Sequence, residues 1–92
     1  MIKSFRHKGL QRFFETGSLA AIQAAHAGRL RQQLLTLHKA KKPDDLAFPG
    51  WHFHALKGSL KNHWAISVSG NWRLTFTFDG EDAILVDYCD YH

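Results

Sequence analysis

Residues 64–88 read WAISVSGNWRLTFTFDGEDAILVDY, and this stretch decides the fold. Its large apolar residues recur at every second position in three runs, which is the period of a β-strand with one buried face. The runs are separated by Gly70-Asn71 and Asp79-Gly80, and both pairs are turn signals between antiparallel strands. The residues on the expected core face are Trp64, Ile66, Val68, Trp72, Leu74, Phe76, Phe78, Ile84, Val86 and Tyr88. The pattern therefore predicts an antiparallel meander of three strands.

The first half of the chain has the periodicity of helices. Residues 7–16 carry an apolar stripe at helical spacing, and Gly17 follows as a stop signal. A second helical stretch covers 20–40, with Gly28 as the candidate point of division, and a loop follows over 43–50. The two stripes consist of Leu10, Phe13 and Phe14, and of Leu30, Leu34 and Leu37. Both helices can pack their stripes against the apolar face of the meander.

The order of these elements indicates an α+β protein. Residues 2–5 are a candidate for a short strand that adds an edge to the sheet. We therefore expect an N-terminal strand and helices packed on an antiparallel β-meander, in a single domain that spans 1–92.

Composition and charge restrict the function to a few classes. The 92 residues include 12 Lys and Arg, 8 Asp and Glu and 7 His, which gives a formal charge of +4. A chain of this kind builds one modest core, which excludes disordered proteins and enzymes with a large cofactor fold. It has neither a run of ~20 apolar residues for a membrane span nor a signal peptide. The single cysteine, Cys89, cannot form an internal disulfide, so we expect the cytoplasm. A small binding module or a small cofactor-free enzyme remains, and the charge favours a polyanionic partner.

The alternation along the second run of the meander assigns a side to its polar residues. Arg73 lies between two core residues, so it points away from the core together with Thr75 and Thr77. This polar face is a candidate binding surface, although an ordinary solvated sheet face has the same pattern.

Residues 52–58, HFHALKG, hold the first cluster of chemically active side chains. In an extended segment His52 and His54 share a face, and Lys57 follows three residues later. One interpretation is a metal site made of these histidines and a third, but no Cys pair or acidic residue completes a usual ligand set. The other is metal-free phosphate chemistry, in which imidazole transfers protons while Lys57 and Arg73 neutralise the phosphate.

The chain ends with the second cluster. Asp90, Tyr91 and His92 supply a carboxylate, a phenol and an imidazole directly after the last strand. The tail can reach the polar face near Arg73, or it can be a frayed terminus without a role. We interpret the preceding Cys89 as a small packed residue and not as a nucleophile.

Five short motifs occur together in an order and spacing that resemble the HigB toxins, the plasmid-maintenance killer-protein branch of the RelE superfamily. They are MIKSF at 1–5, HALKG at 54–58, WAI at 64–66, NWRLTF at 71–76 and DYCDYH at 87–92. The resemblance covers essentially the whole chain, and NWR followed by the terminal DYxDYH is its most specific part. Ala55 departs from the pattern, because the family often has proline there.

The resemblance implies a RelE-like microbial RNase fold and the toxin of a bacterial type II toxin–antitoxin system. Such toxins enter the A site of the 70S ribosome and cut mRNA there without a metal or other cofactor. Their partner is an antitoxin with a helix-turn-helix domain, here HigA-like, and DNA is contacted only through that antitoxin. No membrane partner is implied. The alternative from another class is a non-catalytic RNA- or ribosome-binding module on the same fold.

The family's active-site positions fall on His54, Lys57, Arg73, Asp90, Tyr91 and His92 of this chain. By resemblance, His54 and His92 share the acid and base duties in either order. Arg73 and Lys57 stabilise the phosphate, Asp90 orients or polarises a partner, and Tyr91 stacks on or positions a base.

Overall fold

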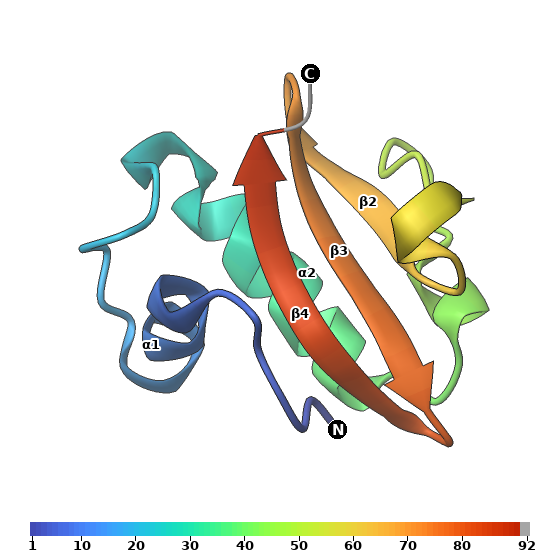
Figure 1. Cartoon of the computed structure of the whole chain (residues 1–92). Coiled ribbons are helices and arrows are strands. Elements are labelled where there is room, and N and C mark those ends of the chain that lie inside the picture. Colours follow the sequence, from blue (N-terminus) through green and yellow to red (C-terminus); the bar gives the residue numbers. More distant parts are fainter. Residues whose placement is uncertain (91–92) are drawn as a thin grey trace.

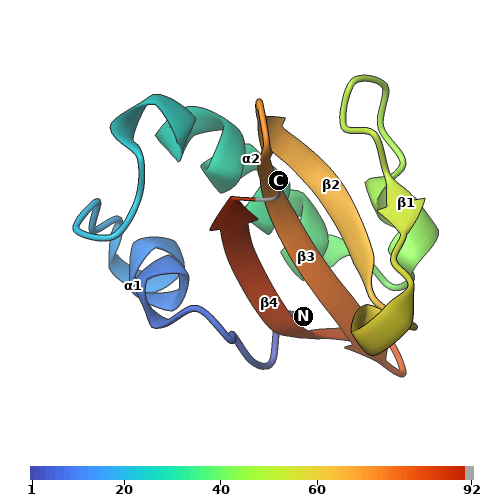
Figure 2. The same cartoon turned by 45° about the horizontal axis from the view of Figure 1, so that its top comes forward.

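The computed structural model describes residues 1–90, which form one four-stranded antiparallel sheet with helices on one side. Figure 1 shows helix α2 behind β3 and β4, and Figure 2 shows β1 at the opposite edge of the sheet from β4. The helices are α1 (Lys8–Thr16) and α2 (Ala27–Lys39), and the strands are β1 (His54–Ala55), β2 (Trp64–Ser69), β3 (Trp72–Asp79) and β4 (Asp82–Asp90). The predicted α+β class and the three-stranded meander are confirmed.

The hydrophobic core lies between the helices and the sheet. Each element contributes the residues that its periodicity places on one face, so the stripes of both helices meet the alternating residues of the strands. The fully buried members are Leu10, Leu30, Leu34, Leu37, Leu46, Ile66, Leu74, Phe76, Ala83 and Val86. This packing holds the sheet against α2 and leaves the opposite face of the sheet for other functions.

Capping residues define both ends of helix α1, His7 at the N-terminus and Gly17 at the C-terminus. The His7 Nδ1 atom accepts the backbone N–H of Leu10 at 2.9 Å, which satisfies one of the free donors of the first turn. Gly17 has φ 80° at the C-terminus, a left-handed conformation that favours glycine. The predicted helix over 7–16 and its stop at Gly17 are therefore confirmed.

Helix α2 is shorter than predicted. It starts at Ala27 and not near residue 20, and a 3₁₀ turn at Ala24–His26 precedes it. The division therefore falls before Gly28, which lies inside the helix. A tertiary contact explains the shift, because His26 turns its ring towards the hydroxyl of Tyr88 on β4. A stretch with helical periodicity is thus held in an irregular conformation by the sheet.

The predicted strand over 2–5 forms only two isolated bridges beside β4. Ile2 pairs with Ala83 and Phe5 pairs with Val86, both in parallel orientation. Between them β4 bulges at Leu85, whose φ is 55°, and its N–H donates to the Ser4 hydroxyl at 2.9 Å. The bulge interrupts the ladder, so this segment follows the edge of β4 without becoming a regular strand.

Because of this bulge, the buried face at the start of β4 differs from the predicted one. The pairing register shifts between Thr75 and Thr77, and as a result Ala83 enters the core in place of Ile84, which is only half-buried. An extra residue in one strand reverses which side chains point to the core beyond the bulge. A prediction that assumes strict alternation along the whole strand cannot include this reversal.

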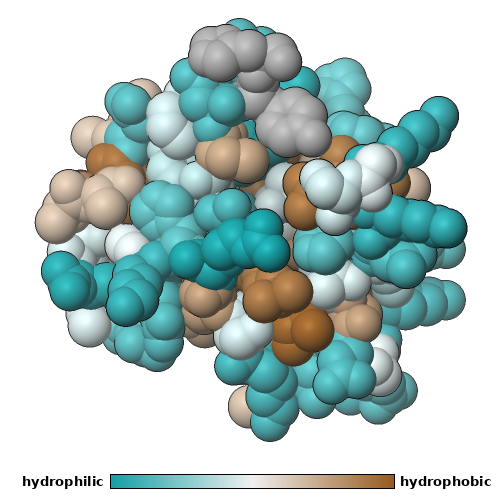
Figure 3. Space-filling view, viewed as in Figure 1, coloured by the Kyte–Doolittle hydropathy of each residue, from teal (hydrophilic) through white to brown (hydrophobic). Residues whose placement is uncertain are grey.

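The face of the sheet that is turned away from the helices is largely hydrophilic (Figure 3). The three residues of β3 predicted to point away from the core, Arg73, Thr75 and Thr77, lie on this face. Thr75 is only 5% exposed, however, and is not an open surface residue. Within residues 1–90, the helices are too short and too polar to cross a membrane.

Candidate functional site on the outer face of the sheet

The outer face of the sheet is the face without helices, and the strand register brings His54 and Arg73 together on it. Strand partners share a face, so the register defines two neighbouring rows across the sheet. They are His54, Ala65, Thr75 and Asp87 in the first row, and Ser67, Arg73 and Cys89 in the second. Ideal strand geometry separates the backbones of His54 and Arg73 by about 7 Å along the strands and about 10 Å across them. The two residues therefore lie on one face of the sheet, in neighbouring rows.

Hydrogen bonds to the backbone hold Arg73 beside the turn between β2 and β3. Its Nη1 donates to the carbonyl oxygen of Gly70 at 2.7 Å and to that of Trp72 at 3.1 Å. Gly70 adopts φ 54°, which lets the turn present its carbonyl towards the guanidinium. Arg73 is half-buried, so its positive charge is fixed in direction before any ligand arrives.

His54 is exposed on the short edge strand β1, and a local contact sets its ring. Its Nδ1 lies 2.7 Å from the carbonyl oxygen of His52. Since a carbonyl only accepts, Nδ1 donates this bond, and in the neutral ring Nε2 carries the lone pair. His54 can thus take or return a proton through Nε2. Lys57 is exposed at the start of the short 3₁₀ turn Gly58–Leu60, three residues further on.

The remaining predicted site residues lie at the end of the chain. Asp90 is the last residue of β4 and pairs with Trp72, whereas Arg73 pairs with Cys89. Because adjacent residues alternate, the register assigns Asp90 to the face of Trp72 and not to that of Arg73. Tyr91 and His92 lie outside the described residues. The structure therefore places His54 and Arg73 on one face of the sheet, and the arrangement of Tyr91 and His92 stays a prediction.

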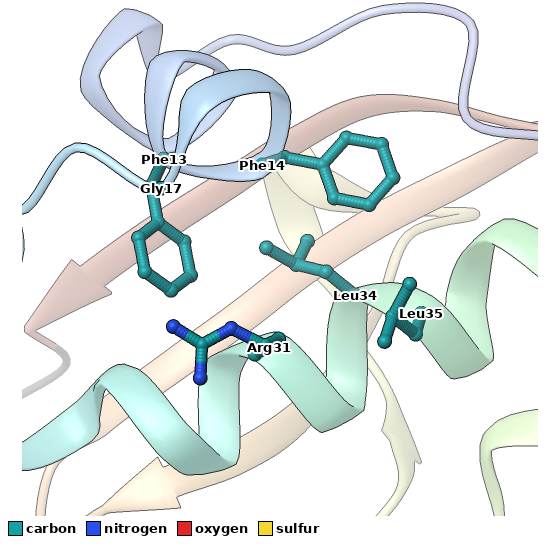
Figure 4. Close-up of a pocket in the computed structure, with 6 residues that line it drawn as sticks. All are labelled: Phe13, Phe14, Gly17, Arg31, Leu34 and Leu35. Carbon is teal, nitrogen blue, oxygen red and sulfur yellow. The ribbon is translucent and has the colours of Figure 1, made fainter.

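Two hollows in the surface are distinct from this face. One, of about 220 Å³, lies between α1 and α2, and Figure 4 shows Phe13, Leu34 and Arg31 facing it. The other follows the exposed side of α1. Residues 1–90 contain no group of three or more His, Cys, Asp or Glu side chains that could hold a metal ion.

Comparison with known proteins identifies the family. The profile of the HigB-like toxins, described as RelE-like toxins of type II toxin–antitoxin systems, matches residues 3–92. The chain belongs to the HigB-like toxin family. It is 39% identical over 92 residues to the endoribonuclease HigB of Proteus vulgaris, and the match covers 100% of both chains. A type II toxin has an antitoxin as its partner, so this follows for the present chain.

A solved structure supports the fold of this HigB-like toxin. A copper-bound mutant toxin from Helicobacter pylori superposes with a TM-score of 0.58 and 24% sequence identity. The match covers 98% of this chain and 94% of the other. At this identity the similarity concerns the arrangement of helices and strands, which agrees with the RelE-like fold expected from the sequence.

The toxin carries two outer-face residues that sequence reasoning did not include in the site. Asp87 shares the row of His54, and Cys89 is the strand partner of Arg73. Burial raises the pKa of the Cys89 thiol, the carboxylates of Asp87 and Asp90 raise this pKa further, and Arg73 lowers it. Asp87 lies between the core residues Val86 and Tyr88, so the alternation of β4 already indicates that its side chain points to the outer face.

The raised pKa of Cys89 predicts slow alkylation of the folded toxin. Only the thiolate reacts, so the midpoint of the rate of reaction with iodoacetamide should lie at higher pH in the folded toxin than in the urea-unfolded chain. The folded state holds this proton more tightly, so the contribution of the thiol to stability falls as pH rises through its folded pKa. Asp87→Asn should lower the midpoint and Arg73→Ala should raise it. A folded midpoint at or below the unfolded one contradicts this assignment.

An aromatic cluster beneath the outer face supports the strand that carries Arg73. The ring of Trp72 stacks on that of Tyr88 with centroids 4.6 Å apart. The Tyr88 hydroxyl lies 2.7 Å from His26 Nδ1 and accepts the N–H of Gln23 at 3.4 Å. Burial raises the pKa of Tyr88, although the Gln23 hydrogen bond opposes this. The phenol therefore stays neutral and ties β4 to the segment before α2.

Proposed function

We propose that this toxin is a metal-independent endoribonuclease that cuts mRNA in the A site of the ribosome. The placement of His54 and Arg73 on the face of the sheet without helices is the observation that carries the proposal, because one supplies a proton-transfer group and the other a fixed cation. The relative from Proteus vulgaris is named an endoribonuclease, which supports the same class of reaction.

The proposed reaction is attack of an RNA 2′-hydroxyl on its own 3′-phosphate. A bond forms between the 2′-oxygen and phosphorus while the bond from phosphorus to the 5′-oxygen breaks. His54 and His92 divide the two proton transfers, one removing the hydroxyl proton and the other protonating the leaving 5′-oxygen. Arg73 and Lys57 neutralise the charge of the pentacoordinate phosphate. Asp90 orients or polarises a partner, and Tyr91 stacks on or positions a base.

The position of these side chains supports dependence on the ribosome. His54 on the edge strand β1 and Lys57 in the segment after it are both exposed, so they can approach a strand of RNA that the ribosome holds. A ribosome supplies binding energy and holds the message in a geometry in which the catalytic groups of the toxin meet the reacting phosphate. The mRNA substrate places the toxin in the cytoplasm. A helix-turn-helix antitoxin, HigA-like, completes the system and makes the contact with DNA.

The proposal predicts a large difference between free and ribosome-bound mRNA. Purified toxin should cleave mRNA on programmed 70S ribosomes at least ~100-fold faster than the same mRNA alone, since the ribosome provides the geometry. The measurement is the rate of appearance of new 5′ ends, mapped by primer extension on ribosome-bound and on free mRNA in the same buffer. Rapid cleavage of naked mRNA contradicts ribosome dependence. Binding to ribosomes without any cut favours the non-catalytic binding module.

A further inference from the structure

Ser67 of β2 is a junction where the helical layer meets the segment that carries His54. Its N–H donates to the carbonyl oxygen of Trp51 at 2.7 Å. Its carbonyl oxygen accepts from two side chains of α2, the Nε2 of Gln33 at 2.7 Å and the Nε of Arg29 at 3.4 Å. Ser67 is also the strand partner of Arg73. One residue thus connects α2, the segment 50–57 and β3.

The connection exists because β1 is short. After Trp51 the chain turns at His52, whose φ is 50°, and regular pairing with β2 resumes only at His54. The carbonyl of Ser67 is therefore satisfied by α2 side chains, since a buried carbonyl needs a donor. Arg29 also donates from Nη2 to the carbonyl oxygen of Gly50 at 3.0 Å. We call Arg29 and Gln33 the α2 bracket. Its two members lie four residues apart on one side of the helix.

Gln33 is a fully buried polar residue whose side chain donates a hydrogen bond to Ser67. Gln33 is 0% exposed, and within residues 1–90 its Oε1 has no hydrogen-bond partner. An unsatisfied buried oxygen destabilises a protein, and an apolar side chain of the same length would avoid it. The Nε2 contact with Ser67 is the feature that an apolar residue cannot supply.

We propose that Arg29 and Gln33 are positioning residues that set His54 relative to Arg73. The bracket determines where segment 50–57 leaves the edge of β2, and Ser67 transmits that placement to the strand that carries Arg73. This inference rests on the proposed function, in which both side chains act on one phosphate. The bracket lies in α2, on the helical side of the sheet, and away from the outer face that carries His54 and Arg73. Its effect appears in the rate of the chemical step, because misplacement of a reacting group by about 1 Å slows a reaction up to ~100-fold.

The test uses Gln33→Met, which keeps the length of the side chain and removes the donor. Gln32→Met is the matched control, because Gln32 is the exposed neighbour on the same helix. Single-turnover cleavage on programmed ribosomes should slow about 10- to 100-fold in Gln33→Met, with the toxin concentration for half-maximal rate unchanged. Gln32→Met should cleave like the unmodified toxin. Circular dichroism and thermal unfolding establish that both variants are folded.

A double variant separates positioning from a general structural effect. If the bracket acts through His54, Gln33→Met should slow cleavage little further once His54→Ala is present. The His54 ring resonance and the Ser67 amide resonance should also move in Gln33→Met and stay in place in Gln32→Met. An equal loss in both backgrounds, or a Gln33→Met rate and spectrum like those of the control, overturns the inference.

The same set of variants distinguishes failure of the inference from failure of the proposed function. Full activity of His54→Ala removes the catalytic role of His54, and with it the effect of the bracket on catalysis. In that case the shift of the His54 resonance in Gln33→Met still reports whether the bracket places the segment. A slow His54→Ala variant beside a fully active Gln33→Met variant overturns the bracket alone.

Discussion

Replacing Arg73 by alanine should reduce cleavage of ribosome-bound mRNA by roughly 10²- to 10³-fold, which is the cost of removing one preorganised group that stabilises developing charge. The guanidinium is already directed by the carbonyls of Gly70 and Trp72, so its contribution requires no reorganisation during the reaction. Arg73→Lys keeps the charge but loses the planar fork, and we expect an intermediate rate. Single-turnover cleavage on programmed ribosomes measures both variants.

Arg12→Ala is the matched control for this experiment. Arg12 is exposed on α1, on the helical side of the sheet, and its loss should leave cleavage unchanged. Loss of the backbone contacts of Arg73 also weakens folding by about 1 kcal/mol, so thermal unfolding of each variant is needed beside the rates. His92→Ala tests the tail in the same assay. Full activity of both Arg73→Ala and His92→Ala would falsify the proposed site.

Leu34→Ala should lower the free energy of unfolding by about 2–5 kcal/mol, because it removes a fully buried side chain and leaves a cavity. Leu34 is 0% exposed in the core between α2 and the sheet. The adjacent Leu35 is 49% exposed, so Leu35→Ala on the same helix should change stability by less than about 1 kcal/mol. The pair has identical chemistry and differs only in burial.

Urea unfolding followed by circular dichroism measures both leucine variants. For a chain of this size, each kcal/mol corresponds to about 4–8 °C in the thermal midpoint, so Leu34→Ala should unfold well below the unmodified toxin. Equal losses at the two positions would contradict the orientation of α2. The comparison also reports on the site, since α2 carries the bracket that holds segment 50–57.

Much of the fold follows from local patterns. The meander depends on period-two alternation and on turn signals such as Gly70-Asn71, which need no distant contact. The end of α1 depends on one glycine, because Gly17 adopts a positive φ at low cost. The position of Arg73 on the outer face follows from the same alternation, and the structure agrees.

Other features depend on contacts between distant segments. The late start of α2 follows from the contact of His26 with Tyr88, which lie 62 residues apart. Ala83 takes the core position predicted for Ile84 because β4 bulges at Leu85. The N–H of Leu85 donates to the hydroxyl of Ser4, near the other end of the chain. No helical or strand periodicity contains this information, so the predicted start of α2 and the predicted buried face at the start of β4 are wrong.

The sequence by itself determined the class of fold, the three strands of the meander and the side on which Arg73 lies. These depend on spacing along one segment, where side-chain direction is set by a period of two or 3.6 residues. Only the tertiary structure decided that His54 lies in the row next to that of Arg73 and that Asp87 lies in the row of His54. The contacts of Arg29 and Gln33 with Ser67 likewise appear only in the tertiary structure. Those relations depend on register between strands and on the packing of α2, which are settled by many weak contacts acting together and not by any one stretch of residues.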